Sequence, residues 1–112
     1  MSNTQEILLS IIASPSVEEN LVDWLLATDE VSGFTSFPVN GHGNSIHSMS
    51  LAEQVSGSRR KILFQTHLPQ PQALQLVEKM KKDFSNCDIH YWMAPLLGAG
   101  RLYEDKLQEN PS

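Results

Sequence analysis

Apolar residues gather in four short segments of the chain, and two longer segments between them show helical spacing. The first, Ile7–Ile12, is a β-branched apolar run that ends before a Ser-Pro pair, and it predicts a buried strand. Three further segments predict strands over 33–39, 59–67 and 89–94. Because Pro38 cannot donate a hydrogen bond within a sheet, the second strand is expected at a sheet edge or at a bulge.

Both longer segments have the pattern of amphipathic helices. The first helix is expected to begin at a capping box, with Ser16 as N-cap and Glu19 reaching back to it, and to run through Ala27. The second is expected to open at Pro69-Gln70-Pro71, since proline suits the first turn of a helix. The apolar stripe of the second helix consists of Ala73, Leu76, Val77, Met80 and Phe84.

The order βαββαβ predicts an α+β, ferredoxin-like fold, in which a four-stranded antiparallel sheet carries two helices on one face. Residues 1–103 are expected to form this single domain, and the polar residues 104–112 a disordered tail. Strands one and four also carry apolar residues on the side away from the helices: Leu8, Ile12 and Trp92. No third helix is predicted to cover that side, so a symmetric homo-oligomer packed through its sheet faces is expected.

The second and third strands are joined by a long polar loop, Asn40–Ser58. Loops of this length are uncommon in compact domains and usually carry function. Ser50-Leu51-Ala52-Glu53 has capping-box spacing, which predicts a helical turn over 51–55. We expect the loop to be partly mobile and to contact a partner or ligand through Gly41, His42, Gly43, His47, Met49, Glu53 and Gln54.

The composition of the chain argues against several classes of function. The formal net charge of −5 argues against a general nucleic-acid binder. The single cysteine, Cys87, excludes an internal disulfide and fits a reducing compartment. The apolar stretch 7–13 is too short for a secretion signal or a membrane span, so a soluble cytoplasmic protein without membrane insertion is expected.

Motifs that would identify an enzyme are missing from the sequence. It contains no Gly-Lys-Ser/Thr phosphate loop, no nucleophile elbow and no paired-carboxylate motif. Gly98-Ala99-Gly100 lacks the rest of a dinucleotide-binding fingerprint and is expected to be a flexible turn. We therefore expect no catalytic activity, and no cofactor is assigned.

Imidazole, thioether and thiolate groups suit Cu(I) or Zn(II). The candidate metal ligands are His42, His47, Met49, Cys87 and His90. The spacing His-x4-His-x-Met matches no tight metal motif. The favoured interpretation is that His42 lies between two glycines because the turn needs positive φ, with its ring solvated or hydrogen-bonded.

Arg59, Arg60 and Lys61 form the one dense basic run. Arg59 and Arg60 are candidate contacts for a phosphate or an acidic partner where the loop re-enters the sheet. The favoured alternative is a solvated strand start that deters edge pairing.

The element order, the long loop and the apolar open face resemble PII-like proteins, small trimeric regulators with a mobile T-loop between their second and third strands. More narrowly, the chain looks like an uncharacterised PII-like family that is often encoded beside heavy-metal efflux pumps. The resemblance covers roughly Glu6 to Leu102. It rests on the segments Asp23–Leu26, Gly33–Ser36, Gly41–Gly43, Ser50–Val55 and His90–Trp92.

This resemblance implies a homotrimer, a loop that contacts a protein partner or ligand, and a regulatory role in signal transduction. Nitrogen-regulatory PII proteins bind nucleotide phosphates with a Gly-rich, Lys-bearing loop between the second helix and the fourth strand. Here that connection, Asp83–Asp88, has no glycine and two acids, and no tyrosine lies between Asn40 and Arg60. ATP and 2-oxoglutarate sensing of the usual kind is therefore not expected.

Two functions follow. The leading one is a PII-like regulator that acts through its loop on a protein partner, such as a transport or metal-efflux component. The alternative is a metal-binding tolerance protein that uses His and Met ligands of the loop.

Overall fold

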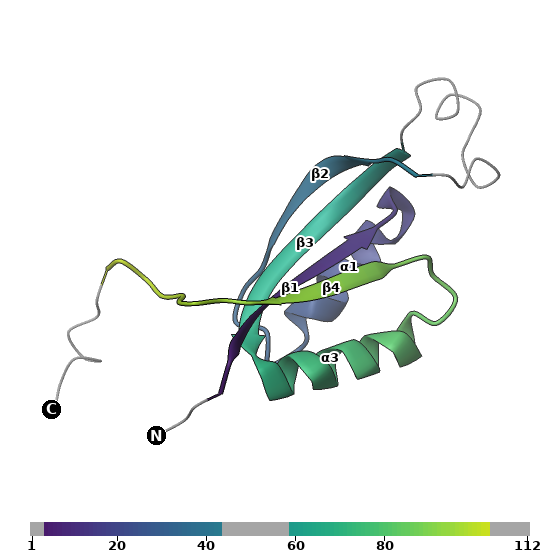
Figure 1. Ribbon diagram of the computed structural model, residues 1–112. Helices are drawn as coiled ribbons and strands as arrows, with labels where there is room; N and C mark the ends of the chain where they lie inside the picture. The colour runs from purple at the N-terminus through teal and green to yellow at the C-terminus, as the bar shows by residue number, and fades with distance from the viewer. Residues whose placement is uncertain (1–3, 44–58, 104–112) are drawn as a thin grey trace, which may run out of the picture.

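The computed structural model describes residues 4–43 and 59–103. Its elements follow the predicted order: β1 (Glu6–Ala13), a 3₁₀ turn (Pro15–Val17), α1 (Glu18–Leu26), β2 (Thr35–Gly41), β3 (Arg59–Pro69), α3 (Gln70–Asp83) and β4 (His90–Pro95). The strands form one antiparallel sheet in the order β2-β3-β1-β4. Figure 1 shows α1 and α3 on the same side of this sheet. The ferredoxin-like prediction is confirmed.

The core lies between the sheet and the two helices. Alternate residues of the central strand β1, from Ile7 to Ala13, point toward the helices and are buried, as is Phe64 of β3. From the helices, Leu21 and Leu25 of α1 pack into the same cluster. The stripe predicted for α3 is buried from Ala73 to Met80, and Phe84, just past the helix end, is partly buried against it.

The capping box predicted at Ser16 is wrong. Helical geometry begins earlier, because Pro15, whose ring fixes φ, opens a 3₁₀ turn that includes Ser16. The N-cap of α1 is Val17, which makes no side-chain cap hydrogen bond. The Ser16 hydroxyl instead lies 2.9 Å from the hydroxyl of Ser14.

The second strand begins and ends two residues later than predicted, because Asn40 and Gly41 pair with Arg60 and Arg59 of β3. The predicted edge position of Pro38 is confirmed, since β2 is an outer strand. The helical turn predicted over 51–55 and the tail over 104–112 lie outside the described residues.

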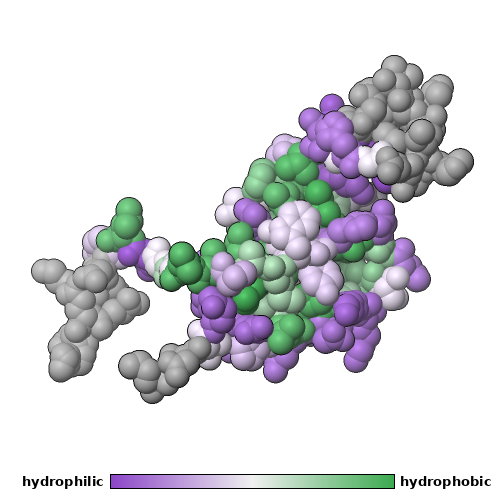
Figure 2. All heavy atoms as spheres, viewed as in Figure 1, coloured by the Kyte–Doolittle hydropathy of each residue, from purple (hydrophilic) through white to green (hydrophobic). Residues whose placement is uncertain are grey.

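The sheet side away from the helices, called the open face here, is partly apolar, as predicted. Leu8, Ile12 and Leu63 are half-buried on it, and Phe37 and Trp92 are 40% and 48% exposed. Figure 2 views the molecule from this side and shows apolar atoms gathered over the sheet. What covers the open face stays a prediction.

The chain continues past β4 as an extended segment, residues 96–103, called the arm here. Leu96 N donates to Glu6 O at 2.9 Å, which prolongs the pairing of β4 with β1 by one residue. Beyond Leu96, the arm leaves the body of the molecule (Figure 1). Among the described residues, no helix is both long and apolar enough to cross a membrane.

Candidate functional site

A pocket of about 430 Å³ lies on the open face where β2 ends and β3 begins. We call it the loop-base pocket, because the chain segment between β2 and β3 starts and ends beside it. Its lining residues are Ile12, Gly41, His42, Gly43, Arg59, Lys61, Asp88, His90, Tyr91 and Trp92.

Strand geometry decides which basic residues reach this pocket. Successive side chains of a strand point to opposite faces, so Arg59 and Lys61 share the open face while Arg60 points to the other side. Arg60 lines a second pocket, beside Pro15 and Pro38, which Lys61 also borders. The structure thus separates the two arginines proposed as anion contacts, and it brings Arg59 together with Lys61.

Lys61 belongs to the basic run predicted from the sequence, but it was not among the two residues named there as anion contacts. It is only 9% exposed, and its side chain passes so close to Gly41 that a Cβ added there would lie 3.1 Å from Lys61 Cγ. Within 4–43 and 59–103, no hydrogen bond or ion pair is found for its ammonium group. A lysine can bury its aliphatic stem while its charged head stays at the surface, so this ammonium is available to an anion in the loop-base pocket.

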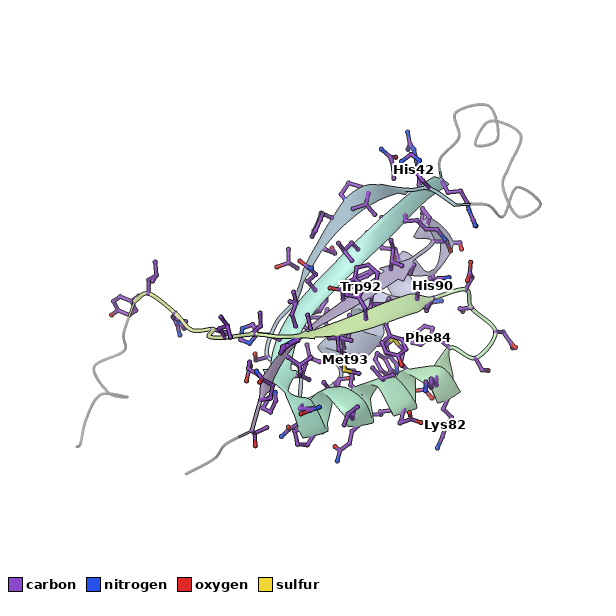
Figure 3. The ribbon with its side chains drawn as sticks, viewed as in Figure 1. His42, Lys82, Phe84, His90, Trp92 and Met93 are labelled. Atoms are coloured by element: carbon purple, nitrogen blue, oxygen red, sulfur yellow. The ribbon has the colours of Figure 1, made fainter. Side chains whose placement is uncertain are left out.

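The opposite rim of the loop-base pocket is formed by the start of β4. His90 Nε2 lies 3.1 Å from Asp88 Oδ1, and both side chains are exposed. Figure 3 shows His42 at the end of β2, His90 at the start of β4 and Trp92 further along β4. Two cations, Arg59 and Lys61, and one carboxylate, Asp88, line the loop-base pocket, so positive charge is in excess there.

The two glycines beside His42 do not have the conformation that we expected. Neither Gly41 nor Gly43 has a φ between +20° and +160°. The interpretation that the turn needs positive φ here is therefore wrong. At Gly41 the missing side chain serves another purpose: it makes room for Lys61.

The five candidate metal ligands are brought together only in part. His42 and His90 line the loop-base pocket, whereas Cys87 lines a different, apolar groove. In the part of the chain that the structure describes, no three His, Cys, Asp or Glu side chains are grouped as a metal site requires. His47 and Met49, like Glu53 and Gln54, lie outside the described residues.

The connection between α3 and β4 also differs from a phosphate-binding loop in its contacts. Asp83 Oδ2 accepts a hydrogen bond of 2.8 Å from Trp24 Nε1, and Asp88 contacts His90. Both acids of the connection are therefore held by neighbouring side chains.

Comparison with known proteins shows which family the chain belongs to. Residues 3–103 match the model of a family described as "Protein of unknown function (DUF3240)". The chain belongs to this family. A solved DUF3240 protein from Shewanella baltica OS155 is 24% identical, with a TM-score of 0.73 over 92% of this chain and 100% of the other. No curated protein matches.

Solved PII-like proteins share the fold of this DUF3240 protein. CPII, a nitrogen regulatory PII-like protein from Thiomonas intermedia K12, is 19% identical, with a TM-score of 0.62 over 86% of this chain and 96% of its own. GlnK from B. subtilis is 18% identical, with a TM-score of 0.58 over 83% and 85%. The resemblance to PII-like proteins is confirmed for the fold.

Proposed function

We propose that this DUF3240 protein is a small PII-like regulatory protein without catalytic activity. In this proposal an anionic signal molecule binds in the loop-base pocket, and the segment 40–58 reports its presence to a protein partner. The observation that carries the proposal is that Lys61, whose ammonium has no hydrogen-bond or ion-pair partner among the described residues, lines the same pocket as Arg59.

The solved structures of the same fold support an anionic ligand. The Thiomonas protein is described as bound to ADP, AMP and bicarbonate, and the B. subtilis protein is a complex with ATP. All four ligands are anions. The acids Asp83 and Asp88 of the α3–β4 connection disfavour a triphosphate held by that connection, so a smaller anion held by Lys61 and Arg59 fits this chain better.

The loop-base pocket lies where ligand binding can change the conformation of the segment that contacts the partner. Gly41, His42 and Arg59 line the pocket and are also where the segment leaves β2 and enters β3. A ligand that binds one arrangement of these residues more tightly than another shifts the population of the whole segment. A transport or metal-efflux component is the partner that the family resemblance implies.

A calorimetric titration of the purified protein with bicarbonate, AMP, ADP and ATP tests the proposal. We expect one of them to bind, and the Lys61→Met variant to bind it at least tenfold more weakly. A charge-assisted hydrogen bond contributes about 1.5–3 kcal/mol, and each 1.4 kcal/mol or so is a factor of ten. The matched control is Lys82→Met, whose exposed side chain points away from the sheet (Figure 3). No binding, or equal binding by Lys61→Met, contradicts the proposal.

The metal-binding alternative is tested in the same instrument with Zn(II) and Cu(I). A metal site needs three or four donors at about 2.0–2.3 Å, held by further hydrogen bonds. Submicromolar metal binding that is lost in a His42→Ala/His47→Ala variant would replace the anion proposal by a metal-tolerance function.

A further inference from the structure

One edge of the sheet is open to a further strand. The sheet order leaves β2 and β4 as outer strands, and β2 carries Pro38 in its middle, whereas β4 has no proline before its last residue, Pro95. Edge strands without a proline or a charge are ready to pair with another strand. The backbone N–H of Leu96 donates to Glu6 in β1. Along an antiparallel strand the backbone N–H groups point alternately toward and away from the partner strand, so those of Tyr91 and Met93 point away from β1, toward the open edge.

An apolar groove accompanies this edge. It has a volume of about 310 Å³ and lies between the start of β4 and the last turns of α3. Val77 and Met80 are buried in its floor, and Phe84, Ile89 and Cys87 also line it. An open edge beside a side-chain pocket is the arrangement with which many domains accept an extended chain as an added strand.

The arm of this protein has the properties of such an extended chain. Leu97 and Leu102 are fully exposed and Tyr103 is largely exposed, so three large apolar side chains project from eight residues. Eight extended residues reach about 26 Å, which exceeds the length of about 20 Å of the six-residue β4. Figure 2 shows the arm standing off the body of the molecule, with apolar atoms at two places along it.

We propose that the arm of one copy adds to the β4 edge of a second copy and inserts Leu97 or Leu102 into its apolar groove. The groove opens at the beginning of β4, whereas the arm starts at the end of β4. The arm runs away from the groove of its own copy (Figure 1). The contact is head-to-tail, so repeating it closes a ring when the rotation permits. The proposal is independent of ligand binding in the loop-base pocket.

The single cysteine of the chain makes the contact testable by cross-linking. Cys87 lines the groove, so Leu97→Cys and Leu102→Cys are prepared separately and oxidised. A disulfide forms only when the two Cα atoms come within about 7 Å. We expect at least one variant to give covalent multimers on a non-reducing gel, and the same variant with Cys87→Ser to give none larger than a dimer.

Leu26→Cys is the matched control, since Leu26 is exposed on α1 and the groove is lined by α3, β4 and their connection. Multimers from Leu26→Cys as strong as those from the arm variants overturn the proposal. So does the absence of cross-links from both arm variants, or a disulfide within one chain.

The rate at which Cys87 reacts with a thiol reagent gives a second measurement that needs no new disulfide. In a Leu97→Ser/Leu102→Ser variant with unchanged circular dichroism, we expect Cys87 to react several-fold faster than in the wild-type protein, because the groove is uncovered. An unchanged rate overturns the proposal.

Discussion

At the scale of single residues, Gly41 and Lys61 depend on each other across β2 and β3. A Gly41→Ala substitution places a methyl group 3.1 Å from Lys61 Cγ, closer than ordinary van der Waals contact, so the lysine side chain must shift. We expect the affinity for the anion to fall several-fold in calorimetry. The free energy of unfolding should change little, because alanine in a strand gains roughly 0.5–1 kcal/mol over glycine, which offsets the crowding.

Gly33→Ala is the control for this substitution. An added Cβ at Gly33 meets nothing within 4 Å, and this glycine lies outside the loop-base pocket. The role given to Gly41 is wrong if Gly41→Ala and Gly33→Ala bind the anion equally well.

The side chains around the loop-base pocket could be predicted from the sequence only in part. Strand alternation alone is enough to separate Arg59 from Arg60, because neighbours along a strand face opposite sides. The burial of Lys61 beside Gly41, however, depends on the register between β2 and β3. A long connection lies between these strands, and no hydrophobic pattern or tight turn in it fixes that register.

At the scale of elements, α1 and α3 are tied together by Trp24. Its indole N–H donates to Asp83 at 2.8 Å, and its ring lies edge-on to Phe84 with ring centroids 5.5 Å apart. Asp83 is the last residue of α3, where a carboxylate is unfavourable to the helix dipole, so the indole N–H partly compensates for its charge. We expect Trp24→Phe to keep the ring contact and to lose about 1 kcal/mol of unfolding free energy in urea.

A double-mutant cycle with Asp83→Ala checks this contact. Once the carboxylate is removed, Trp24→Phe should cost clearly less than it does in the wild-type protein. Simple additivity of the two substitutions means that the hydrogen bond does not couple the helices.

The first and last residues of each strand and helix could be predicted to within about two residues. This was possible because apolar residues recur at a spacing typical of a strand or of a helix. The capping box at Ser16 failed for a local reason. Ser-x-x-Glu spacing predicts a helix start, but Pro15 begins the helical turn one residue before Ser16. Proline at the first helical position outweighed the capping pattern.

At the scale of the whole molecule, we expect copies of the chain to assemble through the open face. Phe37, Leu63 and Ile12 lie side by side in one row across the sheet, and Trp92 stands in the next row beside the buried Ser10. A row of apolar side chains across an exposed sheet face is typical of an interface. Together with the resemblance to PII-like proteins, this row predicts a homotrimer.

Light scattering at micromolar concentration measures the assembly directly. We expect a mass about three times the 12.5 kDa of one chain. Trp92→Lys should lower that mass, because a charge placed between packed sheets cannot be solvated. Leu26→Lys, an equally drastic change at an exposed leucine of α1, should leave it unchanged. A monomer removes the basis of the prediction, while a dimer that Trp92→Lys dissociates keeps the open face as the interface but contradicts the trimer.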